Sequence, residues 1–193
     1  MTVTPTFVHV VLQTNRLAEM KDWYCTVLGA RVVFENEMLC FLTYDDEHHR
    51  IAFAAPGGLT ERTPQTVGMQ HAAYSFPTLA TLLERYGELV AGGIEPFVPI
   101  QHGVTTSLYY RDPDGNLVEF QVDNFSTPDE ATEYMGGPEF AADPIGPAFD
   151  PRRMADAFAA GADPAELATR AWALAGPELP HPITLLAGAG ATA

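Results

Sequence analysis

The stretch LYYRDPDGNLVEFQ, residues 108–121, contains two short apolar runs on either side of a tight turn. Within the turn RDPDGN, residues 111–116, Pro, Asp and Gly stand in the order typical of a hairpin. We therefore expect residues 104–122 to form two antiparallel strands. Alternation along the second strand places Glu119 on one face, and the opposite face carries Val118, Phe120 and Val122. A carboxylate with an apolar wall behind it needs a partner.

The hairpin ends a pattern that occurs twice within the first 124 residues. In the first copy, a strand at 7–12 precedes an amphipathic helix at 16–28 and strands at 30–35, 38–44 and 49–54. In the second copy, a strand at 69–76 precedes a helix at 78–91 and strands near 94–99, 104–111 and 116–122. Because both copies have the order strand, helix, strand, strand, strand, we interpret them as an internal duplication.

Three ionisable residues lie within the predicted strands of these two copies. His9 stands in FVHVVL, His71 in MQHAAYSF, and Glu119 in the last strand of the second copy. Taken alone, each histidine is more often a hydrogen-bonded strand residue than a metal ligand. Together, two histidines and one carboxylate form the ligand set that leaves several positions on Fe(II) open to substrate and oxygen. The combination favours a metal site formed by these three side chains.

Composition restricts the partners and the location that we expect. The formal net charge of −15 argues against nucleic acid, which attracts basic surfaces. No apolar run approaches the roughly 20 residues that span a bilayer, and the N-terminus lacks the features of a signal peptide. Cys25 and Cys40 are expected to be reduced core residues rather than a disulfide. We therefore expect a cytoplasmic protein that binds neither nucleic acid nor a membrane.

Residues 125–193 differ in composition and are rich in Ala, Pro, Gly and Asp. Two short helices are expected here, at 151–160 and 164–175, because each has an Asp cap, a first-turn Pro and a Gly after its end. The last residues, 185–193, are expected to fray. No chemistry is evident in this extension, which we interpret as a cover or an oligomer contact. The alternative is a disordered tail.

The duplicated pattern and the motif at 108–121 resemble the vicinal oxygen chelate superfamily. That superfamily includes glyoxalases, bleomycin-resistance proteins and type I extradiol ring-cleavage dioxygenases. The resemblance implies an α+β fold in which two βαβββ modules, at about 7–55 and 68–123, form a cup-shaped mixed β-sheet around a metal. These modules make up a domain at 1–124, and residues 125–193 form a partly flexible helical extension outside the family pattern.

Within the superfamily, the chain is most similar to a single-domain extradiol dioxygenase. That branch has a metal-binding His on the first strand of each of two modules and a Glu on the last strand. His9, His71 and Glu119 match these positions. Aligning the two modules places Ala52 opposite Glu119, where glyoxalase-like members usually carry a fourth ligand. Because alanine cannot bind a metal, the resemblance implies a metal with an open side.

The same resemblance suggests roles for three further residues. The segment HHRIAF, residues 48–53, places His49 as the acid–base histidine of the site and leaves His48 in a solvated turn. His102, in the segment HGV, resembles a substrate-binding histidine, although it lies slightly nearer to the following tyrosine than in the family pattern. Tyr109, on the strand before Glu119, matches the family's active-site tyrosine.

The function that this resemblance implies is Fe(II)-dependent extradiol cleavage of a catechol ring next to its vicinal diol, with both atoms of O2 incorporated. Mn(II) is an alternative metal, because its ligand preferences overlap those of Fe(II). Two other functions stay open: another metal-dependent enzyme (an isomerase, lyase or thiol transferase) and a metal-free binding or resistance protein. The expected partners are a small aromatic diol and O2, and a homo-oligomer is an expected assembly. The sequence does not identify the catechol.

Overall fold

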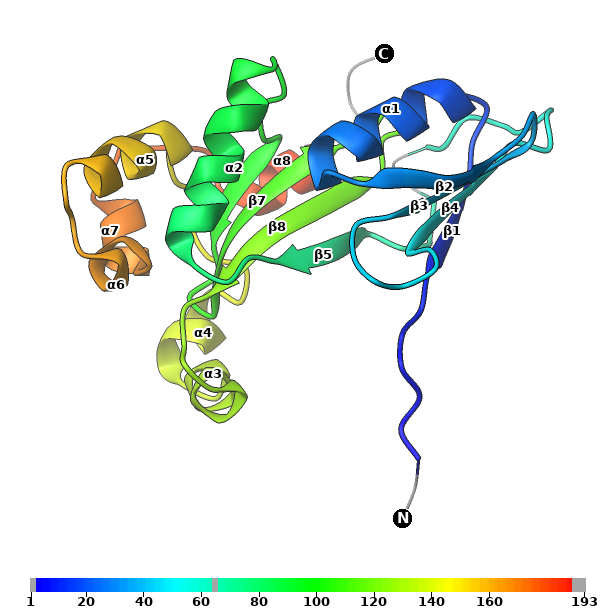
Figure 1. Ribbon diagram of the computed structural model, residues 1–193. Coiled ribbons are helices and arrows are strands. Elements are labelled where there is room, and N and C mark those ends of the chain that lie inside the picture. The colour runs from blue at the N-terminus through cyan, green and yellow to red at the C-terminus, as the bar shows by residue number, and fades with distance from the viewer. Residues whose placement is uncertain (1–2, 64–65, 189–193) are drawn as a thin grey trace. The chain divides into compact units, whose positions relative to one another are not determined.

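The computed structural model describes residues 3–63 and 66–188 (Figure 1). The described residues form two compact units, and each unit contains one four-stranded sheet. The first unit comprises Met1–Arg62 together with Asp112–Asn116, and the second comprises Thr63–Arg111 together with Leu117–Ala193. The turn of the predicted hairpin therefore belongs to the first unit, whereas its two strands belong to the second.

The first unit has the predicted order of one strand, one helix and three strands. Its elements are β1 (Val10–Gln13), α1 (Leu17–Leu28), β2 (Arg31–Glu35), β3 (Leu39–Thr43) and β4 (Ile51–Ala54). The sheet order is β1-β4-β3-β2, in which β1 and β4 are parallel and the other pairs are antiparallel. Helix α1 packs against β3 and β4. Its buried residues Met20, Tyr24 and Val27 share one helical face.

The second unit repeats this topology. Its elements are β5 (His71–Ser75), α2 (Leu79–Ala91), β6 (Val98–Gln101), β7 (Thr105–Arg111) and β8 (Leu117–Asp123). The sheet order is β5-β8-β7-β6, again with one parallel pair, β5 and β8. The predicted α+β fold of two βαβββ modules is confirmed. The strand expected near 94–99 begins later, at Val98.

The two faces of the second sheet have different coverings. Helix α2 begins with a capping box at Thr78 and packs on β8, whose Val118 and Phe120 are buried. On the opposite face, Leu185 and Leu186 pack beside Val98, Ile100 and Tyr109. Those two leucines belong to a helix of the C-terminal extension, so the extension covers part of the face that carries Tyr109.

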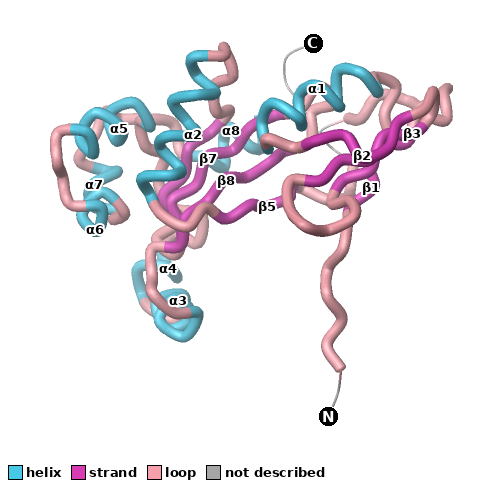
Figure 2. Tube along the Cα trace, in the orientation of Figure 1, coloured by secondary structure: helices cyan, strands magenta, loops and turns pink. Residues whose placement is uncertain are grey.

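The extension contains more helices than the sequence predicts (Figure 2). Its described residues form α3 (Pro128–Met135), α4 (Pro138–Ala142), α5 (Pro151–Ala159), α6 (Pro164–Leu167), α7 (Arg170–Leu174) and α8 (Pro182–Gly188). Helix α5 corresponds to the predicted helix at 151–160. The helix expected at 164–175 is divided into two, because the Thr169 side chain caps a new helix by accepting from Trp172 N. The end expected to fray, 185–193, lies partly outside the described residues.

Two further expectations concern the membrane and the cysteines. Within residues 3–63 and 66–188, no helix is both long and apolar enough to cross a bilayer. Cys25 and Cys40 are free thiols, as expected. Burial of Cys40 raises the pKa of its thiol to about 11, so this residue is an apolar core side chain at neutral pH.

The turn after β7 is organised by the buried carboxylate of Asp112. Its Oδ1 accepts hydrogen bonds from the backbone N–H groups of Asp114 and Asn116, at 3.0 and 2.8 Å. Its Oδ2 accepts from the Asn116 side-chain amide at 2.8 Å and from the Tyr24 hydroxyl at 3.1 Å. The last bond joins the turn to α1. Asp112 is therefore a turn-forming residue, as the sequence suggests.

Replacement of Asp112 tests how far this turn contributes to stability. We expect Asp112→Ala to lower the free energy of unfolding by about 3 kcal/mol, because it leaves several buried donors unpaired. Tyr24→Phe removes one donor and is expected to cost about 1 kcal/mol. Asp123→Ala, at an exposed carboxylate, is the matched control and should change little. Urea denaturation measures all three, and equal stabilities of Asp112→Ala and Asp123→Ala would contradict the assignment.

Candidate active site

His71 and Glu119 lie together on neighbouring strands of the second unit. Strands β5 and β8 are parallel, and their register places Ala73 opposite Glu119. His71 is the first residue of β5, and its Nε2 lies 3.0 Å from Oε2 of Glu119. The Glu119 side chain is only 5% exposed. The pair therefore combines an imidazole that is open to solvent on one side with a buried carboxylate.

The Glu119 carboxylate is stabilised as an anion by its neighbours. Burial alone would raise the pKa of Glu119, because it disfavours the charged form. Hydrogen bonds from His71, Ser107 and Tyr109 outweigh burial, and the pKa lies below its usual value. At neutral pH the group is thus a carboxylate anion held in a fixed position.

The other ring nitrogen of His71 contacts its chain neighbour. Nδ1 of His71 forms a hydrogen bond with Oε1 of Gln70. Nε2 is the ring nitrogen beside Glu119, and a metal held by both side chains would bind this atom.

Tyr109 and His102 complete this group in the second unit. Tyr109 lies directly opposite Glu119 on β7. The Nε2 atom of His102, which follows β6, is 3.0 Å from the Tyr109 hydroxyl and 3.9 Å from Oε1 of Glu119. Tyr110 points to the other face, where its ring packs on Phe120 at 5.2 Å between centroids. Alternation along β7 thus places Tyr109, and not Tyr110, beside the carboxylate.

The pKa values of these two side chains favour neutral forms. Burial raises the pKa of Tyr109, and the charge of Glu119 raises it further, so the phenol keeps its proton. Burial lowers the pKa of His102 below its usual value, although the Glu119 charge acts in the opposite direction. A neutral imidazole and a phenol can both exchange hydrogen bonds with the oxygens of a ligand.

His9 and His49 lie together in the first unit. Their ring centroids are 4.3 Å apart, and the His49 ring stacks on Phe41 at 4.8 Å. Nδ1 of His48 is 2.6 Å from Nδ1 of His49, but the His48 side chain is 66% exposed. Burial lowers the pKa of His49, and the nearby His9 and His48 lower it further. His49 is therefore neutral at pH 7 and able to accept a proton.

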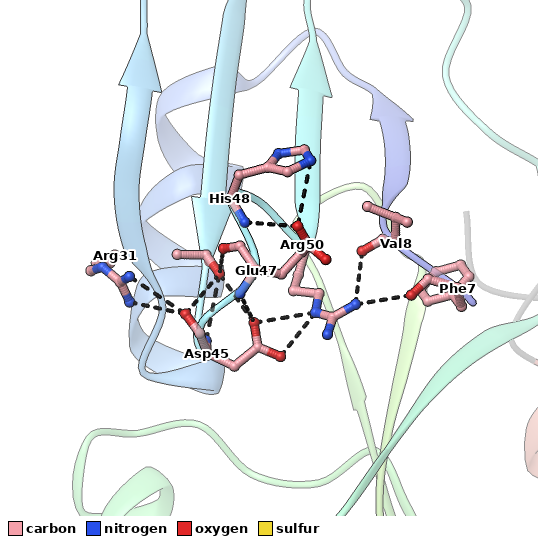
Figure 3. Close-up of polar contacts among 8 residues, drawn as sticks. Phe7, Val8, Arg31, Asp45, Glu47, His48 and Arg50 are labelled. Carbon is pink, nitrogen blue, oxygen red and sulfur yellow. Dashed lines mark hydrogen bonds and ion pairs between the residues drawn. The ribbon is translucent and has the colours of Figure 1, made fainter. Parts of the chain in front are cut away.

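The Arg50 side chain binds the segment that precedes β1. Its guanidinium is paired with Asp45 at 2.9 Å and donates to the carbonyls of Phe7 and Val8 at 3.0 and 3.1 Å (Figure 3). Ladder pairing of β1 starts after these two residues, at Val10. The expectation that His9 lies inside a strand is wrong by one residue, since it immediately precedes β1.

The two sheets have equivalent positions in their registers. In the first unit, Ala52 lies between Val11 and Phe41, its partners on β1 and β3. In the second unit, Glu119 lies in the same way between Ala73 and Tyr109. Ala52 is thus the counterpart of Glu119. Counting back two residues from Val11 and from Ala73 makes His9 the counterpart of His71.

No three His, Cys, Asp or Glu side chains of the described residues are grouped so that they could hold a metal ion. The structure does bring together two predicted ligands, His71 and Glu119, and two predicted catalytic residues, His102 and Tyr109, within the second unit. Within the first unit it brings together His9 and His49. The donor chemistry at His71 and Glu119, an imidazole nitrogen beside an anionic oxygen, suits a divalent transition metal.

The sequence matches the Glyoxalase/Bleomycin resistance protein/Dioxygenase superfamily over residues 6–120, and the chain belongs to this superfamily. Two relatives from Rhodococcus globerulus are similar over almost their whole length. Biphenyl-2,3-diol 1,2-dioxygenase 3 is 61% identical over 176 residues, which cover 90% of this chain and 93% of the relative. Biphenyl-2,3-diol 1,2-dioxygenase 2 is 58% identical over 188 residues, which cover 96% and 99%.

The names of both relatives describe extradiol cleavage, because a bond between carbons 1 and 2 lies next to a diol on carbons 2 and 3. The prediction of an extradiol ring-cleaving dioxygenase for a catechol-type substrate is confirmed by this similarity. These relatives give no support to an isomerase, a lyase, a thiol transferase or a metal-free resistance protein. The homologous extradiol enzymes are metal-dependent.

Solved structures support the fold. A glyoxalase/bleomycin resistance protein/dioxygenase domain from Frankia sp. aligns with a TM-score of 0.55 at 16% identity, covering 65% of this chain and 96% of that chain. A fosfomycin resistance protein from Listeria monocytogenes aligns with a TM-score of 0.52 at 18% identity, covering 68% and 98%. At these identities the similarity concerns the arrangement of helices and strands.

Two residues of the site were missed by sequence reasoning. Ser107 hydrogen-bonds Glu119, and Gln70 contacts the second nitrogen of His71. Ser107 could have been found, since strand alternation places it on the face of Tyr109. Gln70 could not, because its side-chain direction depends on the local path of the chain before β5.

Proposed function

We propose that this chain cleaves the diol-bearing ring of a biaryl catechol such as biphenyl-2,3-diol, using Fe(II) held by His9, His71 and Glu119. The His71–Glu119 pair beside His102 and Tyr109 is the observation that carries the proposal. The substrate class follows from the names of the two Rhodococcus relatives. The bond next to the diol breaks, and both oxygen atoms enter a ring-opened hydroxy-muconic product.

The proposed ligand set combines one residue of the first unit with two of the second. It is supported by the equivalent places of His9 and His71 in their modules. The counterpart of Glu119 is Ala52, so the set has two imidazoles and one carboxylate rather than four ligands. Such a set favours Fe(II) and leaves positions for two substrate oxygens and for O2. Bound Fe(II) supplies chelation of the diol and activation of oxygen.

The remaining polar residues act on protons and developing charge. His49, kept neutral by its lowered pKa, is proposed to take a proton from the catechol and to return one later. Tyr109 keeps its own proton and donates a hydrogen bond to a substrate oxygen as negative charge develops. His102 has a lowered pKa and serves the same oxygens as a neutral partner.

An apolar surface beside His49 supports a substrate with a second aromatic ring. The rings of Phe34 and Phe41 are 5.3 Å apart, and Phe41 in turn stacks on His49. Phe34 is 47% exposed and Val11, on the same sheet, is 53% exposed. Exposed aromatic side chains offer edge and face contacts to an aryl group. We propose that this surface favours an aryl-substituted catechol over catechol itself.

A substrate assay with the whole chain tests this function. The protein is loaded with Fe(II) under anaerobic conditions, mixed with biphenyl-2,3-diol, and exposed to O2 while absorbance and oxygen uptake are recorded. We expect one O2 consumed for each coloured ring-fission product formed, with a higher kcat/KM than for unsubstituted catechol. Loading with Mn(II) in parallel decides between the two metals. Absence of oxygen uptake with either metal and any catechol would contradict the proposal.

Single-residue variants test the ligand set. We expect His9→Ala, His71→Ala and Glu119→Ala each to lower Fe(II) affinity by more than about 100-fold, which exceeds the loss typical of groups that only orient a ligand. The matched control is His181→Ala. His181 pairs with Asp143 at 3.1 Å, also a histidine–carboxylate pair, but lies on the extension. Iron content after equilibrium dialysis is the measurement, and full occupancy in a variant would remove that residue from the set.

The role of His49 is tested by His49→Phe. We expect this variant to retain iron and to bind the diol, while kcat falls by about 10²- to 10⁴-fold because the proton acceptor is lost. His48→Phe is the matched control, and its exposed side chain predicts near-normal turnover. A large loss in His48→Phe with normal turnover in His49→Phe would exchange their roles. Loss of iron in His49→Phe would make His49 a ligand.

Cytoplasmic location and a homo-oligomer are retained as parts of this proposal. The exposed apolar residues Val32, Val33 and Met38, near the β2 edge of the first sheet, support an assembly through that edge.

A further inference from the structure

The segment that carries His102 connects β6 to β7 and makes a tight turn. The backbone N–H of His102 donates to the Thr105 carbonyl at 3.0 Å, and Gly103 has a φ of +89°. The Asn124 side-chain amide donates to Oε1 of Gln101 at 2.8 Å and to the Gly103 carbonyl at 2.9 Å. These bonds define the turn, but none of them involves the His102 carbonyl.

The C-terminal extension contacts this turn directly. The N–H of Gln101 donates to the Pro147 carbonyl at 2.9 Å. The backbone passes so close that a Cβ on Gly146 would lie 2.1 Å from the Gln101 carbonyl oxygen and 3.2 Å from Cα of His102. The backbone of Ile145 also hydrogen-bonds the His102 ring. The segment 145–147 therefore packs along the chain just before and at His102.

The His102 carbonyl is bound by Arg170, the first residue of α7. One terminal nitrogen of Arg170 donates to the His102 carbonyl, and the other donates to the Glu139 carbonyl at 3.2 Å. The guanidinium lies 5.7 and 5.8 Å from the ring centroids of Tyr134 and Phe140. Arg170, which follows His102 by 68 residues along the chain, thus connects the His102 turn to α4.

Arg170 is an unusual buried charge. The residue is only 5% exposed. Among the described residues its Nε has no hydrogen-bond partner, and its two terminal nitrogens bind carbonyls rather than a carboxylate. A buried cation without a counter-ion is costly, and an apolar side chain would fill the same space at lower cost. Packing alone therefore does not account for an arginine at this position.

We propose that Arg170 is a positioning residue of the active site, which holds the His102 carbonyl so that the His102 imidazole stays beside Tyr109 and Glu119. The C-terminal extension is then a part of the active site. This inference rests on the proposed function in assigning His102 to the substrate oxygens. A displacement of about 1 Å at a group that contacts the substrate can reduce turnover by about 100-fold.

Kinetics of matched arginine variants test the proposal. We expect Arg170→Met to lower kcat by about 10- to 100-fold, with KM and iron content nearly unchanged, because His102 contacts the reacting oxygens rather than the metal. Arg170→Lys keeps the charge and one donor and should recover part of kcat. Arg153→Met is the control, since Arg153 also stacks on an aromatic ring, at 3.8 Å from Trp172, and donates to a carbonyl of the extension. Its kcat should stay close to wild type.

A double variant distinguishes positioning from general stabilisation. If Arg170 acts through His102, then His102→Phe and His102→Phe/Arg170→Met should have the same kcat. The proposal would be overturned if the kcat loss of the double variant were the product of the two single losses. A normal kcat in Arg170→Met and Arg170→Lys would also overturn it. A loss in Arg153→Met as large as that in Arg170→Met would also overturn it, because the effect would then be general to the extension.

Hydrogen exchange separates this proposal from the proposed function. Amide exchange in peptides spanning 99–108 should become faster in Arg170→Met and stay unchanged in Arg153→Met, and this measurement needs no substrate. If Arg170→Met exchanges faster but the wild-type enzyme cleaves no diol, the contact between Arg170 and His102 is established and its role in catalysis is rejected. Unchanged exchange in Arg170→Met would overturn the positioning role whatever the activity of the enzyme.

Discussion

The buried carboxylate of Glu119 is the constraint on which the second unit depends. A charge on an apolar strand is costly unless donors surround it, and here His71, Ser107 and Tyr109 supply them from β5 and β7. The parallel pairing of β5 with β8 and the antiparallel pairing of β7 with β8 place all three on one face. The hydrogen bonds of the carboxylate therefore require this register of the sheet. A shift of one residue would move the carboxylate to the face that packs on α2.

The two modules have the same topology but carry different side chains at equivalent positions. In the first unit, Ala52 occupies the position that Glu119 has in the second unit, and it needs no hydrogen-bond donor. Phe41 occupies the position of Tyr109 on the adjacent strand. The first unit therefore has aromatic rings beside its histidines, and the second has a buried carboxylate with its hydrogen-bond donors.

The C-terminal extension packs on the second sheet and on the His102 turn, which its composition does not predict. Its α8 leucines cover Val98, Ile100 and Tyr109, and its Arg170 binds the His102 carbonyl. An exposed tail and a structural part of the second unit are both compatible with a segment rich in alanine and proline. Packing on β6 distinguishes them, since it removes apolar side chains from water on both partners.

The sequence by itself determined the order of strands and helices, the hairpin at 104–122, and the face of its strand that carries Glu119, because these follow from local periodicity and turn chemistry. It did not determine that β1 starts after His9, or that Arg50 binds the Phe7 and Val8 carbonyls before it. Nor did it predict the contact of Arg170 with His102. Only the tertiary structure decided these features, because hydrogen bonds between residues far apart in the chain leave no periodic trace in the sequence.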